Sequence, residues 1–150
     1  MLRILVVFVI LVSYVIAYSN VNRYRNRIQG FILKPTLLIQ TSQSFANDEK
    51  KSAFLSECSS TVAKVLGKPE QYVMISYKIS DGMMYGGSEE PSAFLHLASI
   101  GKIGPEYNPV FSEAICKTMT KHLGIPSNRV YIQFYDSSAA NFGFDGKTFG

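Results

Sequence analysis

The hydrophobic and polar positions of this chain follow one pattern twice. The segment "LGKPEQYVMISYK" at 66–78 returns as "LGIPSNRVYIQFY" at 123–135, with Leu, Gly, Pro, Val and Ile in matching places. At the same offset of 57 residues, "TLLIQTS" at 36–42 lies over "AFLHLAS" at 93–99. The period is too long, and its copies are too few, for a solenoid. The repeat therefore predicts one strand–helix–strand unit that is used twice.

Each unit carries a helical stripe between two short β-branched and aromatic runs. The stripes are Phe54, Leu55, Cys58, Val62, Val65 and Leu66 in the first unit and Phe111, Ala114, Ile115, Met119 and Leu123 in the second. Asn47 and Asn108 are suited to cap the two helices, with Pro109 at the first helical position. Gly67 and Gly124 are suited to end them.

Two such units predict an α+β fold. Two repeated β-α-β units form a four-stranded sheet, with both helices packed on one face. Asp145-Gly146 predicts a short hairpin near the C-terminus. The other face of the sheet, rich in Val, Ile and Tyr, has no cover in such a domain. An uncovered apolar face predicts a partner, so we expect the domain to oligomerise.

Residues 1–34 differ from the rest in composition. A basic start precedes about fifteen apolar residues, "ILVVFVILVSYVIAY", which are few for a membrane-spanning helix of roughly 20. They suit a signal peptide cleaved after Ala17, although the basic cluster "NRYRNR" beyond it suits a membrane anchor. An erroneous upstream start in the gene model is the third alternative. We expect a leader at 1–34 and a domain at 35–150, which is secreted, membrane-anchored or, if the leader is an artefact, cytoplasmic.

The charge of the chain excludes nucleic acid as a partner. The formal net charge is +4 and the pI is about 9.1. Five of the fifteen Lys and Arg side chains fall in residues 1–34, which hold none of the eleven Asp and Glu. The expected domain is therefore close to neutral and has no basic footprint for a phosphate backbone.

The cysteines and histidines predict no metal site and no cofactor. Cys58 and Cys116 match no C-x-x-C or metal-ligand spacing, and both fall on apolar helix faces, so we expect buried free thiols. His96 and His122 have no paired ligands at metal spacing. Neither a Ser-His-Asp nor a Cys-His arrangement can be built from these residues.

Five motifs carry a resemblance to a known family. In chain order they are "GKPEQYV" (67–73), "MYGGSEEP" (84–91), "SIGKIG" (99–104), "RVYIQFYD" (129–136) and "ANFGF" (140–144). Together they resemble the macrophage migration inhibitory factor and D-dopachrome tautomerase family over residues 35–150. The resemblance implies a homotrimer whose sheets face a central axis. It also implies keto–enol tautomerase activity on small aromatic 2-oxo acids such as phenylpyruvate, or on dopachrome, and a receptor protein as a further partner.

The resemblance places the catalytic base at Pro35. In this family the base is the amine of an N-terminal proline, and an amide nitrogen inside an unbroken chain has no such lone pair. Lys68 matches the lysine that binds the substrate carboxylate; otherwise it is a solvated lysine at a helix end. Ser99 and Ile100 match residues that line the pocket.

The resemblance also implies that two residues complete the pocket from a neighbouring subunit, and that an apolar, aromatic rim borders it. Tyr131 and Gln133 lie two apart on a strand and so share a face; Gln133 stands where the family has Asn. Phe142 and Phe144 match the apolar rim, with Phe144 in place of a tryptophan, and phenylalanines near a hairpin also serve packing alone.

Two functions remain open. The first is a secreted trimeric tautomerase whose Pro35 is freed by removal of the leader. The second is a catalytically silent, cytokine-like binding protein in which a persistent leader blocks Pro35. A membrane-tethered form of either is the third alternative.

Overall fold

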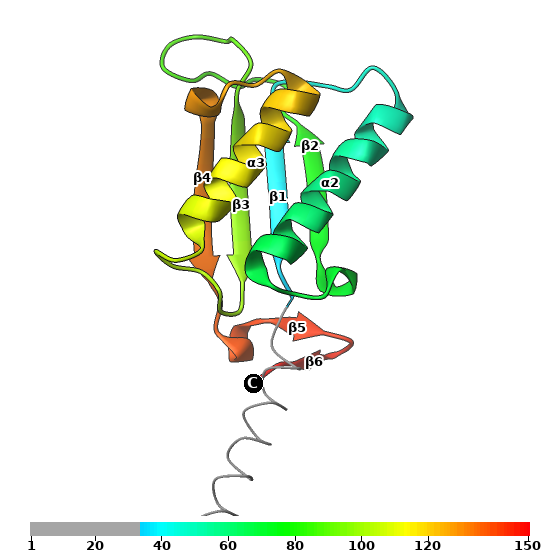
Figure 1. Cartoon of the computed structure of the whole chain (residues 1–150), viewed down its shortest axis with the longest axis vertical. Helices are drawn as coiled ribbons and strands as arrows, with labels where there is room; N and C mark the ends of the chain where they lie inside the picture. The colour runs from blue at the N-terminus through cyan, green and yellow to red at the C-terminus, as the bar shows by residue number, and fades with distance from the viewer. Residues whose placement is uncertain (1–33) are drawn as a thin grey trace, which may run out of the picture. The chain divides into compact units, whose positions relative to one another are not determined.

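The computed structural model describes residues 34–150, so the expected leader, apart from Lys34, lies outside the described residues. Two units of similar build make up the domain (Figure 1). The first contains β1 (Thr36–Thr41), α2 (Asp48–Leu66) and β2 (Met74–Ile79), and the second contains β3 (Ala93–Ser99), α3 (Asn108–Leu123) and β4 (Val130–Asp136). Short 3₁₀ turns η1 (Glu70–Tyr72) and η2 (Ser127–Arg129) lead into β2 and β4.

The sheet has the strand order β2-β1-β3-β4. β1 is parallel to β2 and β3 is parallel to β4, while β1 and β3 are antiparallel. Both helices cover one face of the sheet (Figure 1). The prediction of two β-α-β units with their helices on one face is confirmed.

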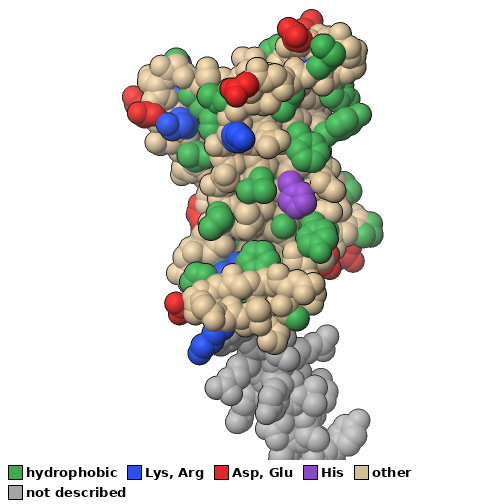
Figure 2. Space-filling model, turned by 180° about the vertical axis from the view of Figure 1, so that it is seen from behind, with side chains coloured by type: hydrophobic (Ala, Val, Ile, Leu, Met, Phe, Trp, Pro, Cys, Tyr) green, Lys and Arg blue, Asp and Glu red, His purple; other side chains and the backbone are tan. Residues whose placement is uncertain are grey.

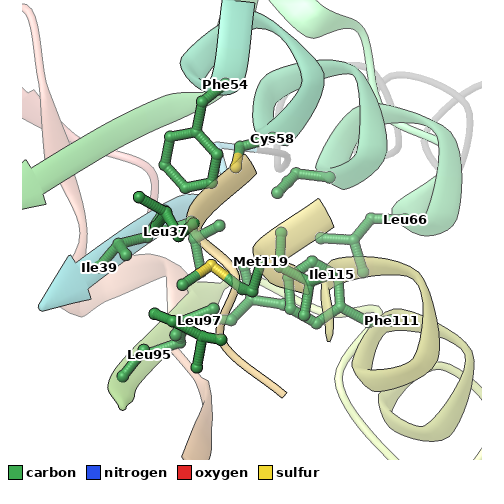
Figure 3. Close-up of a cluster of buried hydrophobic side chains, with 14 residues drawn as sticks. Leu37, Ile39, Phe54, Cys58, Leu66, Leu95, Leu97, Phe111, Ile115 and Met119 are labelled. Atoms are coloured by element: carbon green, nitrogen blue, oxygen red, sulfur yellow. The ribbon is translucent and has the colours of Figure 1, made fainter. Parts of the chain in front are cut away.

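The core lies between the sheet and the two helices (Figure 3). Alternate residues of β1 and β3 point into it, because successive side chains of a strand face opposite sides. The fully buried side chains from both helices and both central strands include Leu37, Ile39, Phe54, Cys58, Leu95, Leu97, Phe111, Ile115 and Met119. The two helical stripes expected from the sequence therefore meet over the central strands.

The helix ends follow the expected residues at α2 but not fully at α3. Asn47 accepts a hydrogen bond from the Lys50 N–H at 2.9 Å, as a cap does. Asn108 was expected as the second cap, but α3 begins at Asn108 itself. Its side-chain oxygen instead accepts from the Gly104 N–H at 2.9 Å and closes the preceding turn. Pro109 accordingly occupies the second helical position.

The second face of the sheet is open and apolar. Figure 2 shows this side of the molecule, with hydrophobic side chains spread across it. The large exposed side chains on it are Leu38, Met74, Phe94, Tyr131 and Tyr135. On the same face, His96 and Gln133 form a hydrogen bond of 3.2 Å between β3 and β4.

A hairpin of β5 (Gly143–Phe144) and β6 (Lys147–Thr148) follows the 3₁₀ turn η3 (Ala139–Asn141). Asp145 and Gly146 both have positive φ, 51° and 72°, as a two-residue type I′ hairpin requires. The predicted turn is confirmed. Between residues 34 and 150 there is no helix of the length and apolar character needed to cross a membrane.

The two cysteines differ more than the sequence indicated. Both are free thiols. Cys58 is fully buried, and burial raises its pKa to about 12, so it is not a nucleophile at neutral pH. Cys116 is only half-buried and lines a groove on the outer side of α3, so the prediction of a buried thiol there is wrong. It falls beside the helical stripe rather than within it.

Candidate active site

Pro35 lies at one end of the sheet, between the two neighbours of β1. The adjacent residue, Thr36, pairs with Met74 of β2 on one side and with Ala98 of β3 on the other. The Met74 N–H donates to the Pro35 carbonyl at 2.9 Å. Pro35 is buried, and the register brings it level with Ser99, the last residue of β3.

Lys68 turns inward at the end of α2. Gly67 takes the left-handed conformation, with φ 61° and ψ 41°, and ends the helix. The side chain of Lys68 is only 5% exposed, so the alternative of a solvated lysine at a helix end is wrong. Its Nζ donates to Ser99 Oγ at 2.5 Å, to the Ile100 carbonyl at 3.0 Å and to the Gly101 carbonyl at 3.2 Å.

The environment of Lys68 makes its ammonium easier to deprotonate. Burial lowers its pKa to about 8; Asp136 acts against this shift and Lys102 acts with it. The three protein acceptors satisfy all three N–H groups of the ammonium. Any carboxylate that binds Lys68 must therefore take the place of one of them, and the Gly101 carbonyl, at 3.2 Å, is the most distant.

Ser99 and Ile100 contact Lys68 at the same end of the sheet. Both are buried, and they contribute a hydroxyl and a backbone carbonyl rather than charge. The structure thus brings together three of the predicted site residues, Lys68, Ser99 and Ile100. The register adds Pro35 beside them.

An aromatic pocket of about 700 Å³ opens next to the start of β1. It is lined by Thr36, Val73 and Met74, by Gln71 and Tyr72, by Phe142, Gly143 and Phe144, and by Lys34. Phe149 stacks on Phe144, with 6.4 Å between ring centroids. The expected rim residues Phe142 and Phe144 therefore border the pocket beside Pro35.

Lys34 and Tyr72 belong to this pocket and were missed from the sequence. The ammonium of Lys34 lies over the ring of Phe144, 5.2 Å from the centroid of Tyr72 and 5.3 Å from that of Phe149. Such contacts are cation–π interactions. Tyr72 falls inside the quoted motif "GKPEQYV", but only the 3₁₀ turn η1 carries it to the start of β2. The residue before Pro35 thus contributes its ammonium to the wall of this pocket.

Tyr131 and Gln133 are not part of this cluster. Tyr131 is level with Phe94 of β3 and hence with Gln40 of β1, five residues beyond Pro35. At about 3.3 Å per residue this is about 16 Å along the strand. Gln133 is level with His96 and Leu38, and both side chains point to the open face. Within one protomer they do not reach the Pro35 end.

The assembled features suit the transfer of a proton on an anionic aromatic molecule. A cationic side chain with polar neighbours lies at the Pro35 end of the sheet, and the apolar, aromatic pocket is lined by the residues on either side of Pro35, Lys34 and Thr36. Among residues 34–150 no group of three or more His, Cys, Asp or Glu side chains is placed to hold a metal ion.

The family model for macrophage migration inhibitory factor matches residues 34–150 of this chain. The chain belongs to the macrophage migration inhibitory factor family. It is 48% identical, over 99 residues, to a macrophage migration inhibitory factor homolog from Brugia malayi, covering 66% of this chain and 86% of that protein. It is 40% identical, over 115 residues, to macrophage migration inhibitory factor from Xenopus laevis, covering 77% of this chain and 98% of that protein.

Solved structures of the family share its fold. Macrophage migration inhibitory factor from Toxoplasma gondii superposes with a TM-score of 0.73 at 33% identity, over 76% of this chain and 99% of that one. A homologue from Prochlorococcus marinus gives a TM-score of 0.72 at 37% identity, over 77% and 99%. The described domain therefore corresponds to the macrophage migration inhibitory factor fold along almost the whole length of these relatives.

Proposed function

We propose that this member of the macrophage migration inhibitory factor family is a keto–enol tautomerase for small aromatic 2-oxo acids such as phenylpyruvate. Its base is the amine of Pro35 once the leader is removed. One observation carries the proposal: Lys68, held by Ser99 and Ile100, lies at the Pro35 end of the sheet beside an aromatic pocket.

The reaction moves one proton between the carbon next to a carbonyl and the carbonyl oxygen. A neutral amine takes the proton from carbon and returns it to the enolate oxygen. A free α-amino group has a pKa near 7.7–8.0. Burial and the nearby ammonium of Lys68 both disfavour its protonated form, so we expect the pKa of a terminal Pro35 to lie lower. The amine is then neutral at physiological pH.

Lys68 would bind the carboxylate of the substrate, and the pocket would hold the ring. The ammonium is already desolvated, so its interaction with an anion is stronger than it would be in water. The rings of Tyr72, Phe142 and Phe144 provide an aromatic wall against which a phenyl group would pack. No metal and no cofactor are needed in this chemistry.

Tyr131 and Gln133 would complete the site from a neighbouring copy of the chain. Tyr131 and Gln133 point out of the open face, far from their own Pro35, and that face carries exposed apolar side chains that need cover. A homotrimer with its sheets facing inward would cover this face and deliver the two residues to an adjacent site. Mixing Pro35→Gly subunits with Tyr131→Ala subunits should then restore part of the activity, because some sites would hold neither change.

Lys34 favours a second function, a cytokine-like binding protein without catalysis, which would act through a receptor. While the leader is attached, Pro35 has no basic nitrogen and the ammonium of Lys34 lies among the rings that line the aromatic pocket. N-terminal sequencing of the natural protein separates the two functions. A chain that begins at Pro35 supports the enzyme; one that begins at Tyr18 or Met1 supports the silent protein. Recovery of the protein outside the cell would support secretion.

The test of the enzyme is a protein that begins at Met-Pro35, from which the methionine is trimmed; its intact mass confirms the new terminus. It should tautomerise phenylpyruvate, and Pro35→Gly should lower kcat/KM by about 100-fold or more. Pro126→Gly, the same substitution at the proline between α3 and η2, is the matched control and should leave kcat/KM unchanged. Equal rates for the Pro35→Gly protein and its parent would require a different base.

A further inference from the structure

The loop after β3, whose carbonyls bind Lys68, is itself hydrogen-bonded to the end of β4. Asp136 is the last residue of β4 and pairs with Ser99 in the β3–β4 ladder. Its Oδ1 accepts a hydrogen bond from the Gly101 N–H at 2.7 Å. The next residue, Ser137, donates its N–H to the Ser99 carbonyl at 2.8 Å. Two consecutive residues of the β4 end therefore fix the start of the loop after β3.

The inner side of this loop supplies every acceptor of the Lys68 ammonium. They are Ser99 Oγ and the carbonyls of Ile100 and Gly101, and Ser99 Oγ also donates to the Gly101 carbonyl at 3.0 Å. Gly101 is thus bound from both sides: its N–H by Asp136, its carbonyl by Lys68 and Ser99. Gly101 has φ 67° and Lys102 has φ 63°. Since a non-glycine residue rarely takes this left-handed conformation, the turn needs outside support.

We propose that Asp136 is a positioning residue for the carboxylate end of the site. By accepting from the Gly101 N–H, it fixes the loop carbonyls that bind the Lys68 ammonium, and it places a negative charge close to that ammonium. The inference rests on the proposed function and names a residue that acts through Lys68 without touching the substrate.

The charges around Lys68 support this role. Asp136 faces it from β4 and favours its protonated form, while Lys102 faces it from the loop and disfavours that form. Without the Asp136 charge, burial and Lys102 would lower the pKa of Lys68 with nothing to oppose them. Lys68 would then lose its proton at a lower pH, and a carboxylate ligand would lose its cation over the same range.

The first experiment follows the titration of Lys68 by NMR in the full chain labelled with ¹³C-lysine, with Lys68→Met to assign the signal. Asp136→Asn keeps an oxygen that can accept from Gly101 and removes only the charge. We expect it to lower the midpoint of the Lys68 titration by about half a pH unit or more. Asp81→Asn, an exposed carboxylate beyond the opposite end of the sheet, is the matched control and should not move the midpoint.

The second experiment compares phenylpyruvate with its ethyl ester in whichever form of the protein turns over. Asp136→Asn should raise KM for the acid about 3- to 10-fold with kcat kept, because it weakens a charged hydrogen bond to the carboxylate, and the rise should begin at a lower pH than in the parent. Asp136→Ala, which also removes the acceptor for Gly101, should raise KM further. The ester has no carboxylate, so its KM should stay the same in both variants.

The outcomes separate this inference from the proposed function. An unmoved Lys68 midpoint in Asp136→Asn, or an equal loss of kcat for acid and ester, overturns the role of Asp136 even if the protein is a tautomerase. A moved midpoint in a protein that shows no turnover after its leader is removed overturns the proposed function and leaves the link between Asp136 and Lys68 standing.

Discussion

The two strand–helix–strand units end their helices with the same turn, yet only one turn supports a candidate site. After α2, Gly67 is followed by Lys68; after α3, Gly124 is followed by Ile125. Both side chains are buried, at 5% and 0% exposure. Ile125 joins the apolar core, whereas Lys68 donates to Ser99 and the loop after it.

The same contrast holds for the strands. At the repeat offset, Ser99 corresponds to Ser42 and Pro35 to Ser92. The Ser92 N–H donates to Ser42 Oγ at 3.1 Å, so this opposite end of the sheet is a closed polar junction. Arg129 secures it by donating to the carbonyls of Pro91, Ser88 and Glu90. The two units share a fold but not the candidate site. The site depends on Lys68 and Pro35, which are replaced by Ile125 and Ser92 in the second unit.

The largest effect on stability should come from placing a lysine at Ile125, the position in the second unit that corresponds to Lys68. Ile125→Lys puts a charge into the core without the polar loop that Lys68 has, so the free energy of unfolding should fall by about 3–5 kcal/mol. Urea denaturation measures it. The reverse change, Lys68→Ile, is the comparison; it leaves the Ile100 and Gly101 carbonyls without this donor and should cost less, about 1–2 kcal/mol. Similar losses for both would mean that the two turns do not differ as described.

The next effect should be on catalysis. Lys68→Met keeps the length and removes the charge, so kcat/KM for phenylpyruvate should fall about 10- to 100-fold, the worth of a charged hydrogen bond. The protein that begins at Met-Pro35 is the parent for this assay. Lys50→Met, an exposed lysine in the first turn of α2, should change kcat/KM by no more than about 2-fold. An unchanged KM in Lys68→Met would remove this lysine from the site.

The buried lysine should also leave a signature in stability against pH. Its pKa is about 8 in the folded chain and 10.5 as the ordinary value, so the folded state binds fewer protons between these values. The stability it contributes is present above about 10.5 and is lost as the pH falls through about 8. Relative to Lys68→Met, the parent should gain at most about 1.4 kcal/mol per pH unit across that window. A flat difference would show that Lys68 titrates normally.

The smallest effect concerns the contact between the two helices. Glu57 of α2 binds Lys121 at 2.6 Å and His122 at 2.9 Å on α3. Hydrogen bonds from His122 and then Lys121 lower the pKa of Glu57 to about 2. Its stabilisation should therefore be present above pH 4.5 and lost as the pH falls toward 2.

Glu57→Gln should cost on the order of 1 kcal/mol at pH 7, since the carboxylate is one-third exposed, and should cost nothing near pH 2. Glu113→Gln removes the exposed pair with Lys117 and should have almost no effect at either pH. A constant cost of Glu57→Gln across pH would argue for packing rather than charge.

The fold could be predicted from the sequence because its signals are local and occur twice. The stripe from Phe54 to Leu66, the left-handed Gly67 and the Asp145-Gly146 turn each determine a short segment through backbone geometry alone. Asn108 shows the limit of such rules. Its side chain was free to cap a helix or to close the turn at Gly104, and the tertiary path of the loop decided between them.

The site could be predicted only in part, because much of it depends on distant residues. Lys68 was expected from the resemblance, but its burial depends on the loop after β3, which no local pattern places near α2. Tyr72 and Lys34 could not be found as pocket residues, because the C-terminal hairpin completes that pocket from more than seventy residues away. Tyr131 and Gln133 need another copy of the chain, which a single sequence does not describe.

The account depends most on the nitrogen of Pro35, and one measurement tests it directly. Turnover of phenylpyruvate should be compared between the full chain and the chain that begins at Pro35, with the intact mass of each preparation recorded alongside. We predict a kcat/KM at least about 100-fold higher for the chain that begins at Pro35. Equal turnover by a preparation whose mass shows residues 1–34 still attached would contradict the account.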